Sequence, residues 1–482
     1  MQWLRYQLSH NFFWTKEMFM HRMQSLIFLI FIFFVSTQTE HANGAEPAPI
    51  APVSAQKAAM SPGSTDANNS QDITKVTLES ALHIALTNNP ELSATKWDVS
   101  AAQARVETAL TARWPSLSVE GGYQHYLDDQ RLIAARYNGE TGKFDTENFR
   151  GDLVLKLPVY TGGRFTAEIE IAELLKTAEE RRLVQTREEL IFNVSSTFYT
   201  LLGQREVIHS LEFAVDAMES HRRQIQDLLA VQKAARVDLL RTEVQLANLK
   251  YTLVAEQNGM ATQKLLLANL LGVDYDPEPI PANEQLEANI TVSPDPVELL
   301  AVALKTRGDF LSARARLESQ DKRVESARSG SRPTVSLFGS YGTRADSGGN
   351  DENIGSAGVL VTIPVFDGGQ VDAKVATEQA ILAASQDRLK KLELQIRREI
   401  ETALLDIRSS RERIKAARQS LEQAGESLRI ERLKYGLSSG SMLEVLDAQT
   451  ALLQSETNHT RAQVDNRIAM ARLKLATGEN VQ

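Results

Sequence analysis

The sequence predicts a mainly α-helical fold with a smaller membrane β part, built from a strand–strand–long helix–helix unit that occurs twice. Three observations predict it: a motif that returns at a constant offset, two pairs of strand-like runs, and two long stretches with a helical heptad pattern. A repeat this long in a chain of 482 residues favours one pseudo-symmetric body over several independent domains.

The repeat is clearest where the strands give way to the helices. The segment Leu157–Gly163 (LPVYTGG) returns as Ile363–Gly369 (IPVFDGG), 206 positions later. Upstream the offset becomes 218, because the first copy has 12 extra residues between its two strand-like runs. The two halves are therefore expected to share one architecture.

Four runs alternate between apolar and more polar residues, which is the period of a strand with one apolar face. They cover residues 115–126, 149–159, 333–343 and 356–366, and each has about the length of a tilted membrane strand. Four strands cannot close a barrel, and an open edge in lipid leaves costly unpaired backbone groups. Several chains must therefore share one barrel. Three chains, with twelve strands, are the fewest that leave a lumen.

Two stretches without proline carry the long helices. No proline occurs between Pro158 and Pro277, or after Pro364. Apolar residues recur there at alternating steps of three and four, a heptad seam typical of supercoiled helices. We expect long helices over residues 164–232 and 369–435, each on the order of 100 Å long.

A second helix follows each long one after a short break. These helices are expected over residues 236–271 and 441–477, and the short breaks make each pair an antiparallel hairpin. The seam of the first long helix is expected at Ile191, Val194, Phe198, Leu201, Ile208, Leu211, Val215, Met218, Ile225 and Leu229. The seam of the helix after it is expected at Leu240, Val244, Ala247, Tyr251, Val254 and Leu265.

The N-terminus has the order of a secretory signal peptide. The apolar run Leu26–Val35 follows His21 and Arg22 and precedes small residues. Such a run is short for a membrane anchor, which is the weaker interpretation. The expected organisation is a signal peptide over residues 1–45, a disordered Ala/Pro/Ser-rich lead-in over 46–72, repeat 1 over 73–272, a linker over 273–296, repeat 2 over 297–478 and a tail over 479–482.

Composition excludes several kinds of site. The chain has no cysteine, so it has no disulfide, no thiolate metal site and no thiol nucleophile. Its net charge of −9 disfavours a nucleic-acid partner. The histidines lack metal-ligand spacing, and no nucleophile and base form a catalytic pattern. We therefore expect no enzyme activity, no metal and no cofactor.

Three features carry a resemblance to a known family. They are the duplicated junction from Pro158 to Gly163 and from Pro364 to Gly369, and the turn and helix from Tyr435 to Gln449. The opening Leu78–Leu82, followed by Ala85–Pro90, is also similar. With these motifs the chain resembles the outer membrane efflux protein family, the TolC-like channels, from about residue 73 to 478.

The resemblance implies a homotrimer in the cell outer membrane that extends into the periplasm. A shared 12-stranded β-barrel would continue into a long α-helical coiled-coil tunnel. The channel would be the passive exit duct of a tripartite efflux or type I secretion system. An inner-membrane pump of unknown class would deliver solutes through a periplasmic adaptor protein.

The resemblance also implies a gate at the far end of the tunnel. Rings of acidic residues fall on Glu444 and Asp447. A tyrosine nine residues before the first acid falls on Tyr435, and its aspartate partner on the other hairpin falls on Asp238. An arginine of the family's closing network is Gly440 here, which puts that part of the network in doubt.

The two helix breaks are the expected periplasmic tips, where the adaptor would dock. They cover residues 231–238 and 436–443. The adaptor-facing residues are expected to be Val231, Arg236, Val237, Gly436, Gly440 and Met442.

Other interpretations stay open. A solvated helix surface would also place Glu444 and Asp447 on one face, and Tyr435 would also suit a packing position. The alternative function is a periplasmic adaptor or a coiled-coil structural protein, although an adaptor would have one hairpin between two β-sandwich halves. The sequence leaves the cargo open among drugs, metals and proteins.

Overall fold

The computed structural model describes residues 75–133, 143–274, 276–279, 295–348, 351–437 and 439–478. The predicted signal peptide and lead-in, most of the linker and the C-terminal tail lie outside the described residues. All described elements belong to one compact unit, Ser70–Gln482.

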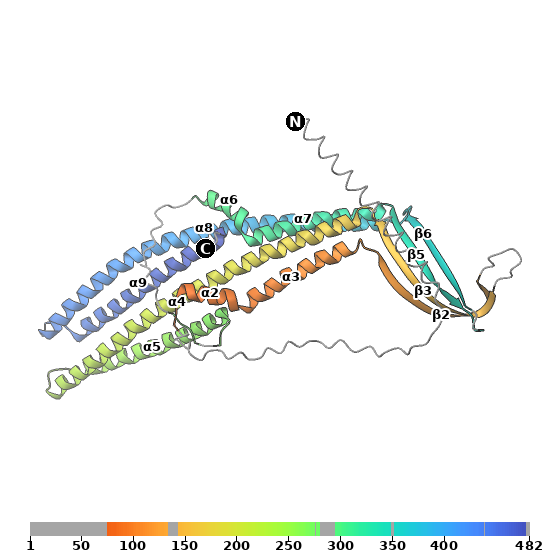
Figure 1. The fold of residues 1–482 in the computed structure, drawn as a ribbon. Helices are drawn as coiled ribbons and strands as arrows, with labels where there is room; N and C mark the ends of the chain where they lie inside the picture. The colour runs from red at the N-terminus through yellow and green to blue at the C-terminus, as the bar shows by residue number, and fades with distance from the viewer. Residues whose placement is uncertain are drawn as a thin grey trace. The chain divides into compact units, whose positions relative to one another are not determined.

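The elements alternate between short helices, strand pairs and long helical hairpins (Figure 1). In chain order they are β1 (Lys75–Val76), α2 (Leu78–Asn88), α3 (Pro90–Thr111), β2 (Ser116–Ile133), β3 (Lys143–Tyr160), α4 (Arg164–Ala230), α5 (Arg236–Leu271), β4 (Glu278–Pro279), α6 (Pro296–Thr306), α7 (Gly308–Arg328), the 3₁₀ turn η1 (Ser329–Ser331), β5 (Thr334–Ala345), β6 (Asp351–Thr362), α8 (Gln370–Gly436) and α9 (Met442–Thr477).

The duplication appears as two matching halves. The long helices α4 and α8 each have 67 residues, and the returning helices α5 and α9 each have 36. Both long helices begin at a Gly-Gly pair whose backbone is left-handed, with φ of 93° at Gly163 and 84° at Gly369. Only glycine adopts this conformation without strain. The repeated Gly-Gly motif therefore turns each strand pair into its helix.

The strands form one antiparallel sheet in the order β2-β3-β5-β6, so β2 and β6 are its edges. On one face Leu153 lies between Val119 and Tyr341. On the other face Asp152 lies between Glu120 and Gly342. The predicted alternation thus gives the sheet one apolar and one polar face.

The strand ends differ from their expected positions. The last strand ends at Thr362, whereas it was expected to continue to residue 366. The strand ends where its partner begins, because Thr362 pairs with Thr334, the first residue of β5. In the first copy β2 and β3 have 18 residues each, against 12 in β5 and β6, so the extra residues of that copy lie in a longer hairpin.

The helices pack side by side. The long helix α4 packs against α5, α7 and α9, while α8 packs against α7 and α9. The predicted seam of α4 is buried from Val194 to Ile225. Among the described residues, none of the helices has the length and hydrophobicity required to cross a membrane.

The seam predicted for α5 is different, because its residues are exposed in the single chain. Leu240, Val244, Tyr251 and Val254 are each more than half exposed. The side of α5 that faces α4 carries Leu246 and other residues instead.

The junction between α6 and α7 approaches α4 closely. A Cβ atom on Gly308 would lie 2.7 Å from the backbone nitrogen of Gln185 and would also overlap the carbonyl oxygen of Arg181. Both obstacles are backbone atoms, which cannot move aside as a flexible side chain can. Gly308 therefore sets how closely the second repeat packs on the first.

We expect Gly308→Ala to destabilise the fold by roughly 1–3 kcal/mol, because an added methyl group overpacks the contact. Gly436→Ala is the matched control, since no atom lies within 4 Å of a Cβ built there. Thermal unfolding followed by circular dichroism would measure both. An equal melting temperature for the two variants would contradict the close contact at Gly308.

Candidate functional site

The two helical hairpins end in turns that close in the same way. The amide of Lys233 donates to the carbonyl of Leu228 at 2.8 Å, and the amide of Ser439 donates to that of Lys434 at 2.9 Å. These bonds lie at equivalent positions of the two repeats and satisfy carbonyls at the helix ends. Each tip is therefore a defined turn.

The hairpins meet in a shared hydrophobic cluster, which we call the tip core. Met218 and Ile225 of α4 and Leu246 of α5 are buried there with Val445 and Leu446 of α9. Residues of both repeats thus bury their apolar faces together, so one chain positions its two tips relative to each other.

The structure brings together two of the predicted gate residues. The Tyr435 side chain is half-buried against the tip core. Burial raises its pKa above the usual value, and the negative charge of Asp238 adds to the rise. Within the described residues no hydrogen bond joins the pair, so their interaction in one chain is electrostatic.

Glu444 caps its own helix. Its carboxylate accepts a hydrogen bond from the Ser441 amide at 2.8 Å, and its amide donates to the Ser441 hydroxyl at 3.3 Å. This capping box begins α9. The bond from the Ser441 amide is the main reason that the pKa of Glu444 lies below its usual value. Asp447 follows on the same helix and is exposed.

The residues predicted to face the adaptor are only partly on the surface. Val231 is 61% exposed and Val237 49% exposed, and Arg236 and Gly436 are also exposed. Gly440 is half-buried. The side chain of Met442, by contrast, is 2% exposed because it packs into the tip core.

Sequence reasoning missed His221, which contacts both ends of the second turn. Its Nε2 atom lies 2.8 Å from the sulfur of Met442, and its ring meets the ring of Tyr435 edge-on at 6.1 Å between centroids. Burial lowers the pKa of His221, and the charge of Arg432 lowers it further, against a hydrogen bond with Gln224. The imidazole is therefore neutral near pH 7. Its spacing from Met218 and Ile225, which places it on the seam face, was the available signal.

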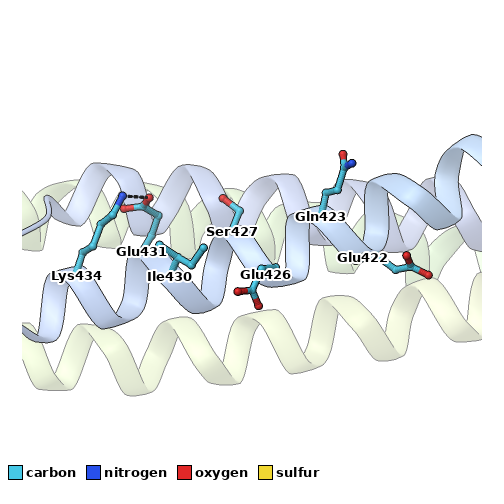
Figure 2. Close-up of a pocket in the computed structure, with 7 residues that line it drawn as sticks. All are labelled: Glu422, Gln423, Glu426, Ser427, Ile430, Glu431 and Lys434. Atoms are coloured by element: carbon cyan, nitrogen blue, oxygen red, sulfur yellow. Dashed lines mark hydrogen bonds and ion pairs between the residues drawn. The ribbon is translucent and has the colours of Figure 1, made fainter.

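An acidic groove runs along α8 next to the tip (Figure 2). Its volume is about 510 Å³, and Glu422, Glu426 and Glu431 lie along it. Lys434, at the end nearer Tyr435, pairs with Glu431 at 2.7 Å. The groove is thus lined by three acidic side chains and one basic side chain.

No chemistry is apparent in this region. In the part of the chain that the structure describes, no three His, Asp or Glu side chains gather as a metal site would require. Within the described residues the tip is built from packing, helix caps and charge.

We expect acid to weaken the tip through His221. Its pKa is lower in the folded chain than the ordinary 6.5, so the unfolded chain takes up the proton more readily. The stabilisation from the neutral side chain is therefore present above pH 6.5 and is lost as the pH falls below it. The difference between the melting temperatures at pH 7.5 and pH 5.5 should be larger in the parent than in His221→Gln.

His209→Gln is the matched control, because His209 lies on the same helix and is exposed. It should behave like the parent. If the parent and both variants lose the same stability in acid, His221 does not hold the tip.

Comparison with known proteins identifies the family. The sequence profile described as "Outer membrane efflux protein" matches residues 81–273 and 299–479. Outer membrane protein TolC of Escherichia coli is 22% identical over 406 residues, which are 81% of this chain and 80% of that protein. Outer membrane protein OprJ of Pseudomonas aeruginosa is 25% identical over 425 residues, 83% of this chain and 84% of that protein.

The fold agrees with this assignment. The crystal structure of a membrane protein from Pseudomonas aeruginosa matches with a TM-score of 0.73 at 23% identity, over 83% of this chain and 92% of that one. The family profile spans most of both repeats. The chain therefore belongs to the outer membrane efflux protein family: it is an outer-membrane efflux channel and not an enzyme.

Proposed function

We propose that three copies of the chain form one channel, with a shared 12-stranded barrel in the outer membrane and a helical tunnel in the periplasm. The observation that carries the proposal is that the sheet and the helical layer each have two unpartnered edges. If one edge of each layer in one copy contacted the opposite edge in the next copy, the sheet and the helical layer would both close into rings.

The sheet supports this closure. Its outer strands β2 and β6 have no partner on one side within the described chain. Backbone groups cannot stay unpaired in lipid, and only a closed barrel satisfies them all. Pairing β2 of one copy with β6 of the next continues the antiparallel pattern. Three copies close a barrel of twelve strands, which is wide enough for a lumen.

The helices support the same arrangement. In the half of the bundle next to the tips their contacts give the order α5-α4-α9-α8, so α5 and α8 are the outer helices there; towards the strands α3 and α7 pack on α4 instead. The exposed stripe of α5, from Leu240 to Val254, faces no helix of its own chain. Helix α8 also exposes apolar residues near its tip end, among them Ile430 and Leu433. The stripe of α5 in one copy would pack against α8 of the next, as heptad seams do.

The tips would connect the channel to a periplasmic adaptor and an inner-membrane pump. Helix α4 begins four residues after β3 ends, α8 begins eight residues after β6 ends, and each runs for 67 residues. At 1.5 Å per residue the turn lies on the order of 100 Å away. Exposed apolar residues at the turn, Val231, Val237 and Leu437, suit a protein partner. The chain would be a passive duct, and the cargo would be set by the pump.

The gate would lie where the three pairs of tips converge. Three-fold symmetry would bring three copies of Glu444 and Asp447 around one axis, where their field attracts cations. The Tyr435–Asp238 contact would hold the hairpins together against this repulsion. In the closed trimer the Tyr435 hydroxyl would donate to the Asp238 carboxylate, a bond that the described single chain lacks, and a hydrogen bond to a charged group is worth roughly 1.5–3 kcal/mol.

Bilayer recordings test the gate. Tyr435→Phe with Asp238→Ala should raise the open fraction about tenfold, because a loss near 1.4 kcal/mol in the closed state has that effect. Glu444→Gln with Asp447→Asn should instead reduce cation selectivity. Glutamine preserves the capping box, so the second variant removes charge with little disturbance of the helix. Parent-like conductance and selectivity in both variants would rule these residues out as the gate.

The apolar face of the sheet should face lipid. Leu155→Arg or Val361→Arg, both on that face, should cost roughly 2–4 kcal/mol at mid-membrane depth. Ser118→Arg is the control, since Ser118 lies on the polar face and pairs with Val154, next to Leu155. The measurement is the yield of heat-resistant trimers. Equal yields for Leu155→Arg and Ser118→Arg would show that the two faces are assigned wrongly.

A further inference from the structure

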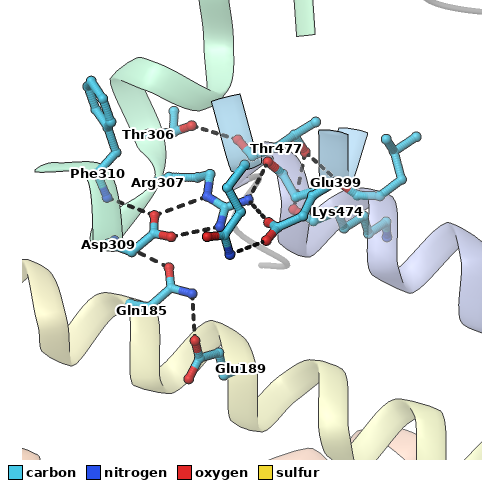
Figure 3. A network of polar contacts seen from close by, with 12 residues as sticks. Gln185, Glu189, Thr306, Arg307, Asp309, Phe310, Glu399, Lys474 and Thr477 are labelled. Atoms are coloured by element: carbon cyan, nitrogen blue, oxygen red, sulfur yellow. Dashed lines mark hydrogen bonds and ion pairs between the residues drawn. The ribbon is translucent and has the colours of Figure 1, made fainter. Parts of the chain in front are cut away.

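A polar joint lies where the junction of α6 and α7 meets α4 and α8 (Figure 3). Its centre is Arg307, between α6 and α7, whose side chain is only 4% exposed. The guanidinium donates to both oxygens of Asp309, at 3.0 and 2.7 Å, and to Glu399 of α8 at 2.8 Å. It also reaches the carbonyl of Ala476 at the end of α9, at 3.2 Å.

The joint also reaches α4 of the first repeat. The Asp309 amide donates to the Gln185 side chain at 3.4 Å, and Gln185 in turn donates to Glu189 at 2.8 Å. Gly308 allows the close approach described above. Arg307 therefore joins elements of the second repeat, and the Asp309 amide links them to α4 of the first.

The matching place in the first repeat carries no charge. There Asn89 stands where the second repeat has Arg307, and its amide donates to the carbonyl of Leu270 at 2.9 Å. Leu270 and Ala476 are themselves repeat equivalents. A neutral amide therefore suffices to cap this junction, so capping alone does not account for the charged side chains around Arg307.

One further acid faces this joint and has no partner. Glu188 of α4 is 7% exposed, and neither of its carboxylate oxygens has a hydrogen-bond partner among the described residues. Burial raises the pKa of Glu188 to about 7; the charge of Arg307 lowers it and that of Asp309 raises it. On its own helix Arg187 and Glu189 act in opposite directions.

The other helices near this part of α4 place no charge in the interior. On α2 and α3 the ionisable side chains Glu79, His83 and Glu91 are exposed. Arg307 is therefore the buried cation that Glu188 could pair with, and it already forms ion pairs with Asp309 and Glu399.

We propose that Glu188 is a proton-controlled switch of the joint between the repeats. With the carboxyl neutral, Arg307 stays bonded to Asp309 and Glu399 and the joint is closed. An ionised carboxylate cannot stay buried without a partner. Ionised Glu188 therefore either attracts Arg307 away from Asp309 and Glu399 or becomes hydrated. Either outcome loosens α7 from α4 as the pH rises.

Cysteine labelling in the assembled, naturally cysteine-free protein tests the switch. Ser312→Cys on α7 places a thiol beside the joint, at a position only 6% exposed. Asp321→Cys is exposed on the same helix, so its reaction rate shows the effect of pH on thiol ionisation alone. The corrected rate is the rate of Ser312→Cys divided by that of Asp321→Cys. The corrected maleimide reaction rate of Ser312→Cys should rise about tenfold between pH 6 and 8.5, because the ionised fraction of Glu188 rises from roughly a tenth to nearly all.

Substitutions separate this switch from a general effect of pH. Glu188→Gln cannot ionise, so its corrected rate should not change with pH. Glu188→Met gives the same test if glutamine disturbs assembly. Glu180→Gln, at an exposed acid elsewhere on α4, should behave like the parent. A flat rate in the parent, or a tenfold rise in Glu188→Gln, would overturn the proposal.

Discussion

Unpaired backbone groups at the edges of the sheet are the constraint on which the rest of the architecture depends. Strands β2 and β6 each leave one side open, and no segment of the described chain covers either. In lipid such edges are too costly to persist, so the barrel is completed by other copies. Assembly is therefore a condition for a stable membrane part, and the single chain is a fraction of the functional wall.

The helical layer follows from the same constraint. Gly163 and Gly369 form the turns that lead from the two strand pairs into α4 and α8. Each strand pair is therefore followed along the chain by one long helical hairpin. The outer helix α5 then exposes an apolar stripe just as the outer strand exposes its backbone. If the strands of neighbouring copies pair at β2 and β6, the outer helices α5 and α8 of those copies are brought together as well. The tip core and the Arg307 joint hold the two repeats in register within each copy.

Much of this fold could be predicted from the sequence, because repeats and heptad seams are local patterns. The α4 seam is buried as expected, whereas the α5 seam is exposed: periodicity identifies an apolar face but not the chain that covers it. The end of the last strand was misplaced because apolar alternation continues past Thr362, whereas the partner strand β5 begins at Thr334 and offers no further backbone groups to pair with. Met442 was expected at the surface, since a turn position does not reveal which way a side chain packs. His221 and Glu188 were missed because their environments are made by distant helices.

The central claim, that three copies close through their sheet edges, is tested most directly by disulfide crosslinking. One cysteine is placed in β2 and one in β6, over several registers, in this cysteine-free chain. Oxidation in the membrane followed by denaturing electrophoresis should, in at least one register, give covalent dimers and trimers and nothing larger. A ladder that continues beyond three chains, products that stop at two, or no product in any register would contradict a closed three-chain barrel.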